Sequence, residues 1–141
     1  MAGLTGEAAI ERARAALAFG GRVPARASYV ERLDHPGLGY YLVIFGEEAE
    51  AVGVAAIDGT TGDVSSHAPL AGTRAHLPIT AARALELGGA VFGSPRLVWR
   101  PCRASQAMLS PIWEIQTAGG PIYIDQQGRR WTQLDPAGPG G

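Results

Sequence analysis

Residues 120–131 read GPIYIDQQGRRW, and this stretch decides how the chain folds. An apolar run ends on an Ile-Asp pair, and a glycine follows Asp125 three residues later. Residues 54–64, VAAIDGTTGDV, have the same order, with a glycine four residues after Asp58. Such a pattern is typical of a strand that enters a turn, because an Asp side chain bonds nearby backbone N–H groups. The recurrence predicts that the chain is a duplication.

Each of the two strand ends closes a segment that begins with a helix signal. Thr5 is a good N-cap, and Glu7 follows in the first turn, where a negative charge is favourable. The apolar residues that recur on one face of this helix are Ile10, Ala13 and Leu17. Thr80 caps a shorter second helix, and the glycine pairs at 20–21 and 88–89 predict where the two helices end.

Strand signals fill the rest of both halves. Residues 27–33 and 40–45 are rich in β-forming residues, and Pro and Gly between them predict a hairpin. Residues 40–45 are apolar at every position, which indicates a central strand covered on both faces. The remaining predicted strands are residues 52–57, 96–102, 111–117 and 121–125.

The predicted fold is therefore α+β, with two α-β-β-β repeats that each place one helix on an antiparallel sheet. The first unit covers residues 1–64 and the second covers residues 79–134. Residues 65–78, with two prolines and a glycine, are expected to form a linker, and residues 135–141 a disordered tail. A unit of about 60 residues buries only a marginal core by itself, so one compact domain is expected.

Composition and charge limit the kinds of partner. The chain is 46% hydrophobic and 18% charged, which fits a well-buried globular protein. Residues 1–70 carry five arginines against nine acids, whereas residues 71–141 carry seven arginines against four acids. The total charge of −1 is too small for nucleic-acid binding, but the basic second half would suit an acidic partner. Alternatively, the opposite charges could help the two halves of the chain dock together. A homo-oligomer is a further candidate among the partners.

Cysteine usage and the apolar runs bear on the compartment. A single cysteine, Cys102, excludes an internal disulfide and every multi-cysteine metal motif. Residues 1–19 contain acids and arginines throughout, unlike a secretory signal. Since no apolar run approaches the roughly 20 residues of a membrane span, we expect a cytoplasmic protein with no membrane partner.

The helix opening and the strand ending together resemble the PepSY family. In the first unit the matching residues are Thr5, Ala9, Ile57, Asp58, Gly62 and Val64. In the second unit they are Ile79, Thr80, Ala84, Tyr123, Asp125, Gly128 and Trp131, with the Asp-to-Gly spacing one residue shorter. The resemblance implies a cystatin-like module of a helix on an antiparallel sheet. Such modules are non-catalytic, and they occur in peptidase propeptides and in bacterial proteins that bind or restrain other proteins.

A second likeness, limited to the first half, is to small cytoplasmic toxin-immunity proteins. It rests on the strand end at residues 57–64 and on the helix-then-strands layout. The resemblances therefore favour a protein-binding or regulatory module that restrains a partner. An immunity-type inhibitor of a toxin and an enzyme with an unrecognised site are the alternatives.

Motifs of catalysis and cofactor binding are missing from the sequence. The three histidines, His35, His67 and His76, lack a spacing that would put two imidazoles on one face. Ser65, Ser66 and His67 are adjacent, but no G-x-S-x-G elbow surrounds them. The glycine pairs do not form a nucleotide fingerprint. We therefore expect no metal, no cofactor and no catalytic residue.

The cysteine has two interpretations. Arg100 and Arg103 flank Cys102, and neighbouring positive charge favours a reactive thiolate. A buried, unreactive thiol is the alternative.

Strand alternation predicts a binding face in the second half. Trp113 and Ile115 share one face, and Trp99 is expected to join them in the core. The expected outward residues on the opposite side are Arg100, Glu114 and Tyr123, with Arg103 beside them. Arginine and tyrosine are enriched at protein interfaces, so this face is predicted to bind an acidic or peptide-like partner. The alternative is an ordinary solvated sheet face.

Overall fold

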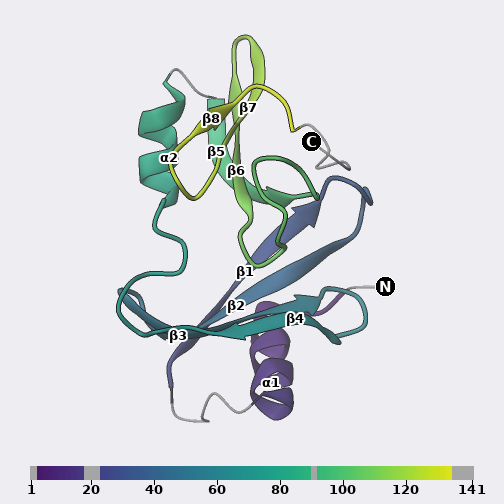
Figure 1. Ribbon diagram of the computed structural model, residues 1–141. Helices are drawn as coiled ribbons and strands as arrows, with labels where there is room; N and C mark the ends of the chain where they lie inside the picture. Colours follow the sequence, from purple (N-terminus) through teal and green to yellow (C-terminus); the bar gives the residue numbers. More distant parts are fainter. Residues whose placement is uncertain (1–2, 18–22, 90–91, 135–141) are drawn as a thin grey trace. The chain divides into compact units, whose positions relative to one another are not determined.

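The structure, a computed structural model, describes residues 3–17, 23–89 and 92–134 (Figure 1). The chain divides into two compact units. Unit 1 comprises Met1–Glu31 and His35–His76, and unit 2 comprises Arg32–Asp34 and Leu77–Gly141. The described residues form two helices and eight strands, and the pairing within each unit is antiparallel. The α+β class predicted from the sequence is confirmed.

Unit 1 is a helix followed by a four-stranded meander. Its elements are α1 (Gly6–Ala16), β1 (Ala25–Arg32), β2 (Gly39–Glu47), β3 (Glu50–Asp58) and β4 (Val64–Pro69). The strands lie in the order β4-β3-β2-β1, so each strand pairs with its neighbour in the chain. The predicted hairpin is confirmed, with Tyr29 opposite Tyr41 in the β1–β2 pair.

Helix α1 packs on the sheet through two alanines. The Thr5 cap is confirmed, because its Oγ1 accepts a hydrogen bond of 3.1 Å from the N–H of Ala8. Ala9 and Ala13 are fully buried, and they share a core cluster with four residues of β2 and β3. The helix ends at Ala16, where the following residue is extended. The glycine pair at 20–21, which the sequence predicts as the stop, lies outside the described residues.

Strand β2, one of the two inner strands of the unit 1 meander, is buried on both faces, as its apolar sequence predicts. Tyr40, Leu42 and Ile44 are buried on one side, and Val43 and Phe45 on the other. Val43 and Phe45 belong to the cluster that α1 covers (Figure 1).

The expected linker, residues 65–78, is a strand over its first part. A tight turn follows Asp58, whose N–H donates to the carbonyl of Asp63 at 2.8 Å. This turn folds the chain back, so residues 66–69 pair with β3 as part of β4. The linker prediction is wrong here because β4 is an edge strand with alternating exposure, and its Ser-Ser-His sequence gives little apolar signal. Pro69 ends this strand, where a proline is tolerated.

Unit 2 has the same order of elements. They are α2 (Ala81–Gly88), β5 (Phe92–Trp99), β6 (Ile112–Thr117), β7 (Gly120–Ile124) and β8 (Arg130–Trp131), and the strands lie in chain order. The sequence predicts neither β4 nor β8, so each unit has four strands instead of three. The first predicted strand of this half also ends early, at Trp99, and Cys102 instead forms an isolated bridge with Ser105.

The helix of unit 2 covers one face of its sheet. Thr80 Oγ1 accepts a hydrogen bond of 3.1 Å from the N–H of Arg83, so this cap is confirmed. Gly89 follows the last helical residue with φ 78°, a conformation that glycine adopts readily, as the predicted stop requires. Ala84 packs against Ile115, Ile122 and Ile124.

A second cluster of unit 2 contains three buried residues, Cys102, Ile112 and Leu134. The segment Arg32–Asp34 belongs to this unit, because Leu33 packs against the cluster and its N–H donates to the carbonyl of Trp99 at 2.9 Å. The tail, residues 135–141, lies outside the described residues. Neither described helix is both long and apolar enough to cross a membrane.

Candidate functional site

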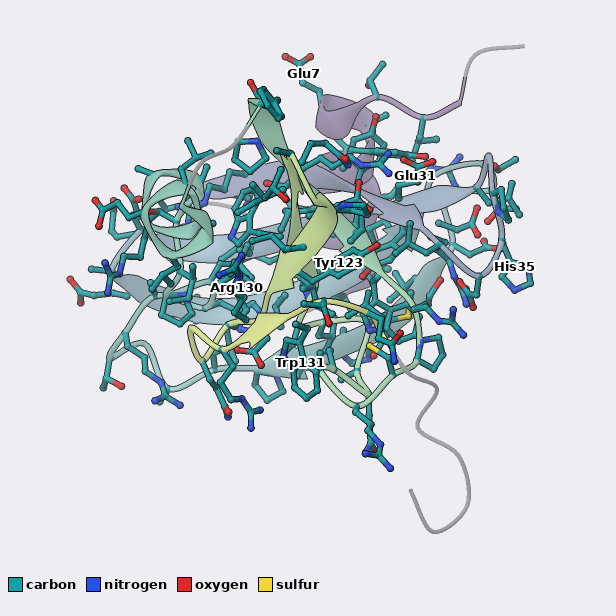
Figure 2. The ribbon with its side chains drawn as sticks, turned by 90° about the horizontal axis from the view of Figure 1, so that it is seen from above. Glu7, Glu31, His35, Tyr123, Arg130 and Trp131 are labelled. Carbon is teal, nitrogen blue, oxygen red and sulfur yellow. The ribbon has the colours of Figure 1, made fainter. Side chains whose placement is uncertain are left out.

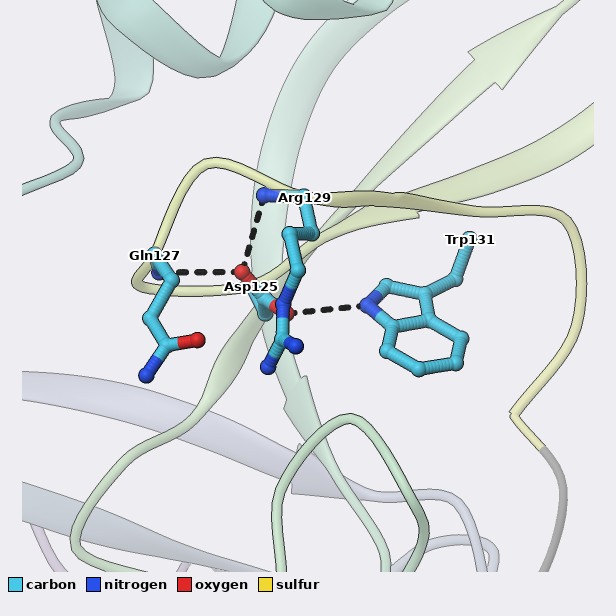
Figure 3. A network of polar contacts seen from close by, with 4 residues as sticks. All are labelled: Asp125, Gln127, Arg129 and Trp131. Carbon is cyan, nitrogen blue, oxygen red and sulfur yellow. Dashed lines mark hydrogen bonds and ion pairs between the residues drawn. The ribbon is translucent and has the colours of Figure 1, made fainter.

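The turn between β7 and β8 is organised by one buried carboxylate (Figure 3). Asp125 is only 3% exposed, and its carboxylate accepts four hydrogen bonds. Its Oδ1 accepts from the backbone N–H groups of Gln127 and Arg129, both at 2.9 Å. Its Oδ2 accepts from Arg129 Nε at 3.0 Å and from Trp131 Nε1 at 2.9 Å. All four donors lie within six residues of Asp125, so the motif builds the whole network.

Backbone hydrogen bonds close the same turn. The N–H of Gly128 donates to the carbonyl of Asp125, and the N–H of Asp125 donates to the carbonyl of Arg129, both at 3.0 Å. Gly128 has φ 82°, which a residue with a side chain rarely adopts. The turn then returns the chain to pair Trp131 with Tyr123 across β7 and β8.

Arg129 is restrained by this network but remains accessible. Its Nε is bound by Asp125, and its Cζ lies 5.7 Å from the centroid of the Trp131 ring. The Arg129 side chain is nevertheless 58% exposed. The site therefore presents a guanidinium whose orientation is already set, with an indole beside it.

An open cavity of about 280 Å³ adjoins Arg129. Residues 125–127 and 129 line one side, and residues 104–107 and 110 line the other. Hydrogen bonds fix this second wall, since Cys102 and Ser105 exchange two backbone hydrogen bonds of 3.1 Å. The Ser105 hydroxyl is also 2.7 Å from the carbonyl of Ser110, to which it donates. Both walls of the cavity are therefore held by short-range contacts.

Glu114, predicted to face outward for binding, is only 5% exposed. Its Oε1 accepts hydrogen bonds from Arg96 Nε at 2.7 Å and from Gln116 Nε2 at 3.3 Å. It also hydrogen-bonds the Tyr123 hydroxyl. The predicted alternation is correct, but the inference of exposure is wrong. Ile112 shares this face, where the second cluster of unit 2 includes Tyr123, Trp131 and Leu134.

The other predicted binding residues are less buried. Tyr123 is half-buried, and burial raises the pKa of its hydroxyl, helped by the charge and hydrogen bond of Glu114 and opposed by Arg96 and Arg100. Arg100 is also half-buried, and its Nε is buried without a hydrogen-bond partner in the described part of the chain. The structure thus brings Arg100, Glu114 and Tyr123 together, whereas Arg103 is exposed in the loop after β5.

The tryptophans predicted for the core differ in burial. Trp99 is 5% exposed, with Arg32 Cζ 5.2 Å from its ring centroid, which confirms its prediction. Trp113 is only partly buried, although it packs against the α2 cluster and its Nε1 donates to the carbonyl of Ile79 at 2.7 Å.

Sequence reasoning missed Arg129 and the 104–110 loop as site components. The available signal was the Asp-x-x-x-Arg spacing in residues 125–129, which we interpreted only as a turn. The sequence of the 104–110 loop gives no indication of the site, because the loop becomes a wall of the cavity only through packing between segments that are distant in the chain.

Side chains that bind metals do not gather in the described part of the chain. In residues 3–17, 23–89 and 92–134, no three His, Cys, Asp or Glu side chains gather as a metal site. Cys102 is fully buried, and its Sγ donates to the carbonyl of Ser105 at 3.6 Å, as expected for an unreactive thiol.

Comparison with protein-family models, with curated proteins and with solved structures finds no match to this chain.

Proposed function

We propose that the chain is a non-catalytic protein-binding module that binds an acidic segment of a partner protein at Arg129. The observation that carries the proposal is the restraint of an exposed arginine by Asp125 and Trp131 beside a cavity. A guanidinium matches a carboxylate as a two-pronged donor. Because this side chain is already oriented, binding costs less conformational entropy than it would at a free arginine.

Charge supports an acidic partner. Unit 2 contains seven arginines and five acids. Arg103 and Arg130 are exposed in the same unit, and Arg130 directly follows Arg129. An excess of arginines over acids accelerates the encounter with an acidic segment and disfavours basic partners.

The hydrogen bonding of the two buried carboxylates, Asp125 and Glu114, supports a role in binding instead of catalysis. Asp125 accepts four hydrogen bonds, and Glu114 accepts from an arginine, a glutamine and a tyrosine. Carboxylates engaged in this way stabilise and orient their donors.

The common plan of the two units supports a duplicated, PepSY-like module that restrains its partner. Each unit has a threonine-capped helix and then a four-stranded meander. In each, an aspartate at the end of the third strand or directly after it accepts two backbone N–H groups through Oδ1. For Asp58 the donors are Thr60 and Thr61, and for Asp125 they are Gln127 and Arg129.

The test is selection of binding peptides from a random display library, with the full chain as target. We expect the selected peptides to carry Asp or Glu, and Arg129→Gln to weaken their binding about tenfold, as loss of an interface arginine often does. Arg83→Gln is the matched control, because Arg83 is exposed on α2 in the same unit and pairs only with Glu86 among the contacts described. Peptides that bind Arg129→Gln as tightly as the native chain would rule out this site.

A further inference from the structure

Unit 1 has a pocket lined by two tyrosines, whereas the site in unit 2 is built around an arginine. The pocket has a volume of about 530 Å³. Two tyrosines, four glycines, Leu4 and Thr60 line it. All of these residues belong to unit 1.

The two tyrosines form a fixed aromatic corner. Tyr29 on β1 and Tyr41 on β2 are register partners, and their ring centroids lie 5.3 Å apart at an interplanar angle of 68°. The Tyr41 hydroxyl donates to the carbonyl of Leu4 at 2.8 Å, which holds that ring in place. Tyr29 is 49% exposed, so a large part of this aromatic surface faces solvent.

Glycines let the walls of the pocket pack closely on one another. A Cβ at Gly39 would lie 2.3 Å from the Tyr29 hydroxyl oxygen and 2.5 Å from the Val30 carbonyl oxygen. A Cβ at Gly59 would lie 2.9 Å from the carbonyl oxygen of Gly39. Backbone hydrogen bonds tie the floor together, from Leu4 to Gly59 at 2.8 Å and from Gly59 to Gly39 at 3.0 Å. The shape of the pocket is therefore set by these backbone contacts and by the Tyr29 ring packed on Gly39.

A carboxylate lies next to this corner. Glu31 is opposite Gly39 in the β1–β2 register and two residues from Tyr29, so the three share one face of the hairpin. Burial raises the pKa of Tyr29, and the negative charge of Glu31 raises it further. Glu7 and Glu31, both labelled in Figure 2, belong to unit 1. Unit 1 has eight acids and five arginines in all, so its net charge is negative.

An exposed apolar residue adjoins two lining residues of the pocket in the chain. Leu38 is 50% exposed and stands between two of the lining glycines, Gly37 and Gly39. In the described part of the chain four large hydrophobic residues are exposed; one of them, Tyr29, lines this pocket, and another, Leu38, is the chain neighbour of two lining glycines. Exposed apolar residues around a hollow are typical of an interaction surface.

We infer that the Tyr29–Tyr41 pocket binds an arginine side chain presented by a partner protein. The tyrosine rings offer apolar faces for a guanidinium and its stem, and Glu31 supplies the opposite charge. An arginine suits the pocket better than a lysine, because a planar guanidinium stacks on aromatic rings and loses less hydration. This second site lies in a different unit and binds the opposite charge, so it stands independently of the proposed function at Arg129.

The test uses the full chain and two capped tripeptides, Gly-Arg-Gly and Gly-citrulline-Gly, which differ in charge but hardly in shape. In an NMR titration we expect the arginine peptide to shift the Tyr29 and Tyr41 ring signals and the Gly39 and Gly59 amides. The citrulline peptide should bind about threefold to fivefold more weakly, the size of an exposed cation–π contact. Equal binding of the two peptides, or no shift at these residues, would overturn the inference.

Variants locate the interaction. Tyr29→Leu keeps apolar cover over Gly39 but removes the aromatic face, and Glu31→Gln removes the charge with little change of shape; each should weaken the arginine peptide about threefold or more. Glu48→Gln is the matched control, since Glu48 is an exposed acid of the same unit in the turn after β2, and we expect unchanged binding. Arg129→Gln should also leave this binding unchanged, which separates the two sites. A loss in Glu48→Gln equal to that in Glu31→Gln would reduce the effect to general charge and overturn the inference.

Discussion

Asp125 and Asp58 each organise a turn at the end of the third strand of their unit, but they have different surroundings. Both accept two backbone N–H groups through Oδ1. Only Asp125 is buried, and its second oxygen binds the side chains of Arg129 and Trp131. The local turn chemistry was predictable from sequence, because donors two to four residues away follow from the backbone of the turn. The burial was not, since it depends on which other segments cover the turn.

This difference gives a prediction for Asp125→Asn. Asparagine keeps the shape but replaces one acceptor oxygen with an NH₂ group, which must face a donor. A buried donor without a partner is costly, so we expect the free energy of unfolding to fall by about 2–3 kcal/mol. Urea denaturation followed by tryptophan fluorescence measures the change. Asp58→Asn, at the less buried turn, should cost about 1 kcal/mol, and equal costs at the two sites would contradict this account.

The raised pKa of Tyr123 predicts how the stability of the protein changes at alkaline pH. Its pKa is raised in the folded protein, first by burial and then by Glu114, so the folded state keeps the hydroxyl proton to higher pH than the unfolded chain does. The contribution to stability is complete below about pH 10, the usual tyrosine pKa, and is lost as the pH rises through the folded-state value. We therefore expect the urea midpoint to stay constant up to about pH 10 and to fall as the pH rises further. Tyr123→Phe should flatten this fall, and an unchanged slope would contradict the assignment. Some slope should remain, because the pKa of Tyr29 is also raised.

The β1–β2 hairpin depends on close packing over Gly39. Tyr29 lies diagonally across this glycine, so its ring occupies the space that a Cβ would need. Gly39→Ala must displace both the tyrosine ring and the Val30 carbonyl, and such overpacking costs about 1–3 kcal/mol. Thermal unfolding of the variant measures this. Gly119→Ala is the control, since the nearest atom to its Cβ would be Thr117 Oγ1 at 3.9 Å, and a similar loss there would disprove the steric explanation.

Elements with strong local signals were predicted, and short edge strands were not. Both helix caps and the apolar strand β2 followed from their own residues. Strand β4 carries a serine-rich sequence, and β8 has only two residues, so neither has a periodicity to detect. The exposure of Glu114 was mispredicted for a related reason. Alternation assigns it to the face opposite Trp113, but Trp131 and Leu134, far along the chain, belong to the cluster on that face. The arginine site was missed because it needs β8 and the 104–110 loop in place.

At the scale of the whole chain, the division into units does not follow the division of the sequence. Residues 32–34 stand inside the β1–β2 hairpin, yet they belong to unit 2. Arg32 binds Asp34 at 2.6 Å and lies over the Trp99 ring, and Leu33 packs beside Cys102, Ile112 and Leu134. A repeat boundary drawn from sequence similarity, at residues 65–78, therefore separates unit 2 from part of its own core.

It follows that a fragment of residues 77–141 should not fold as unit 2 does in the intact chain. The fragment lacks Leu33 and its hydrogen bond to the Trp99 carbonyl. Because a unit of this size buries only a marginal core, the loss of these contacts is enough to prevent folding. Circular dichroism should find no cooperative melting, and a cooperative transition near that of the intact chain would refute the role of residues 32–34. In the intact chain Leu33→Ala isolates the same contact and should cost about 1–2 kcal/mol, because the side chain is only partly buried. Leu38→Ala, five residues away and 50% exposed, should change stability by less than about 0.5 kcal/mol. If the two leucines cost the same, the cluster around Cys102 does not depend on this segment, and the failure of the fragment would need another cause.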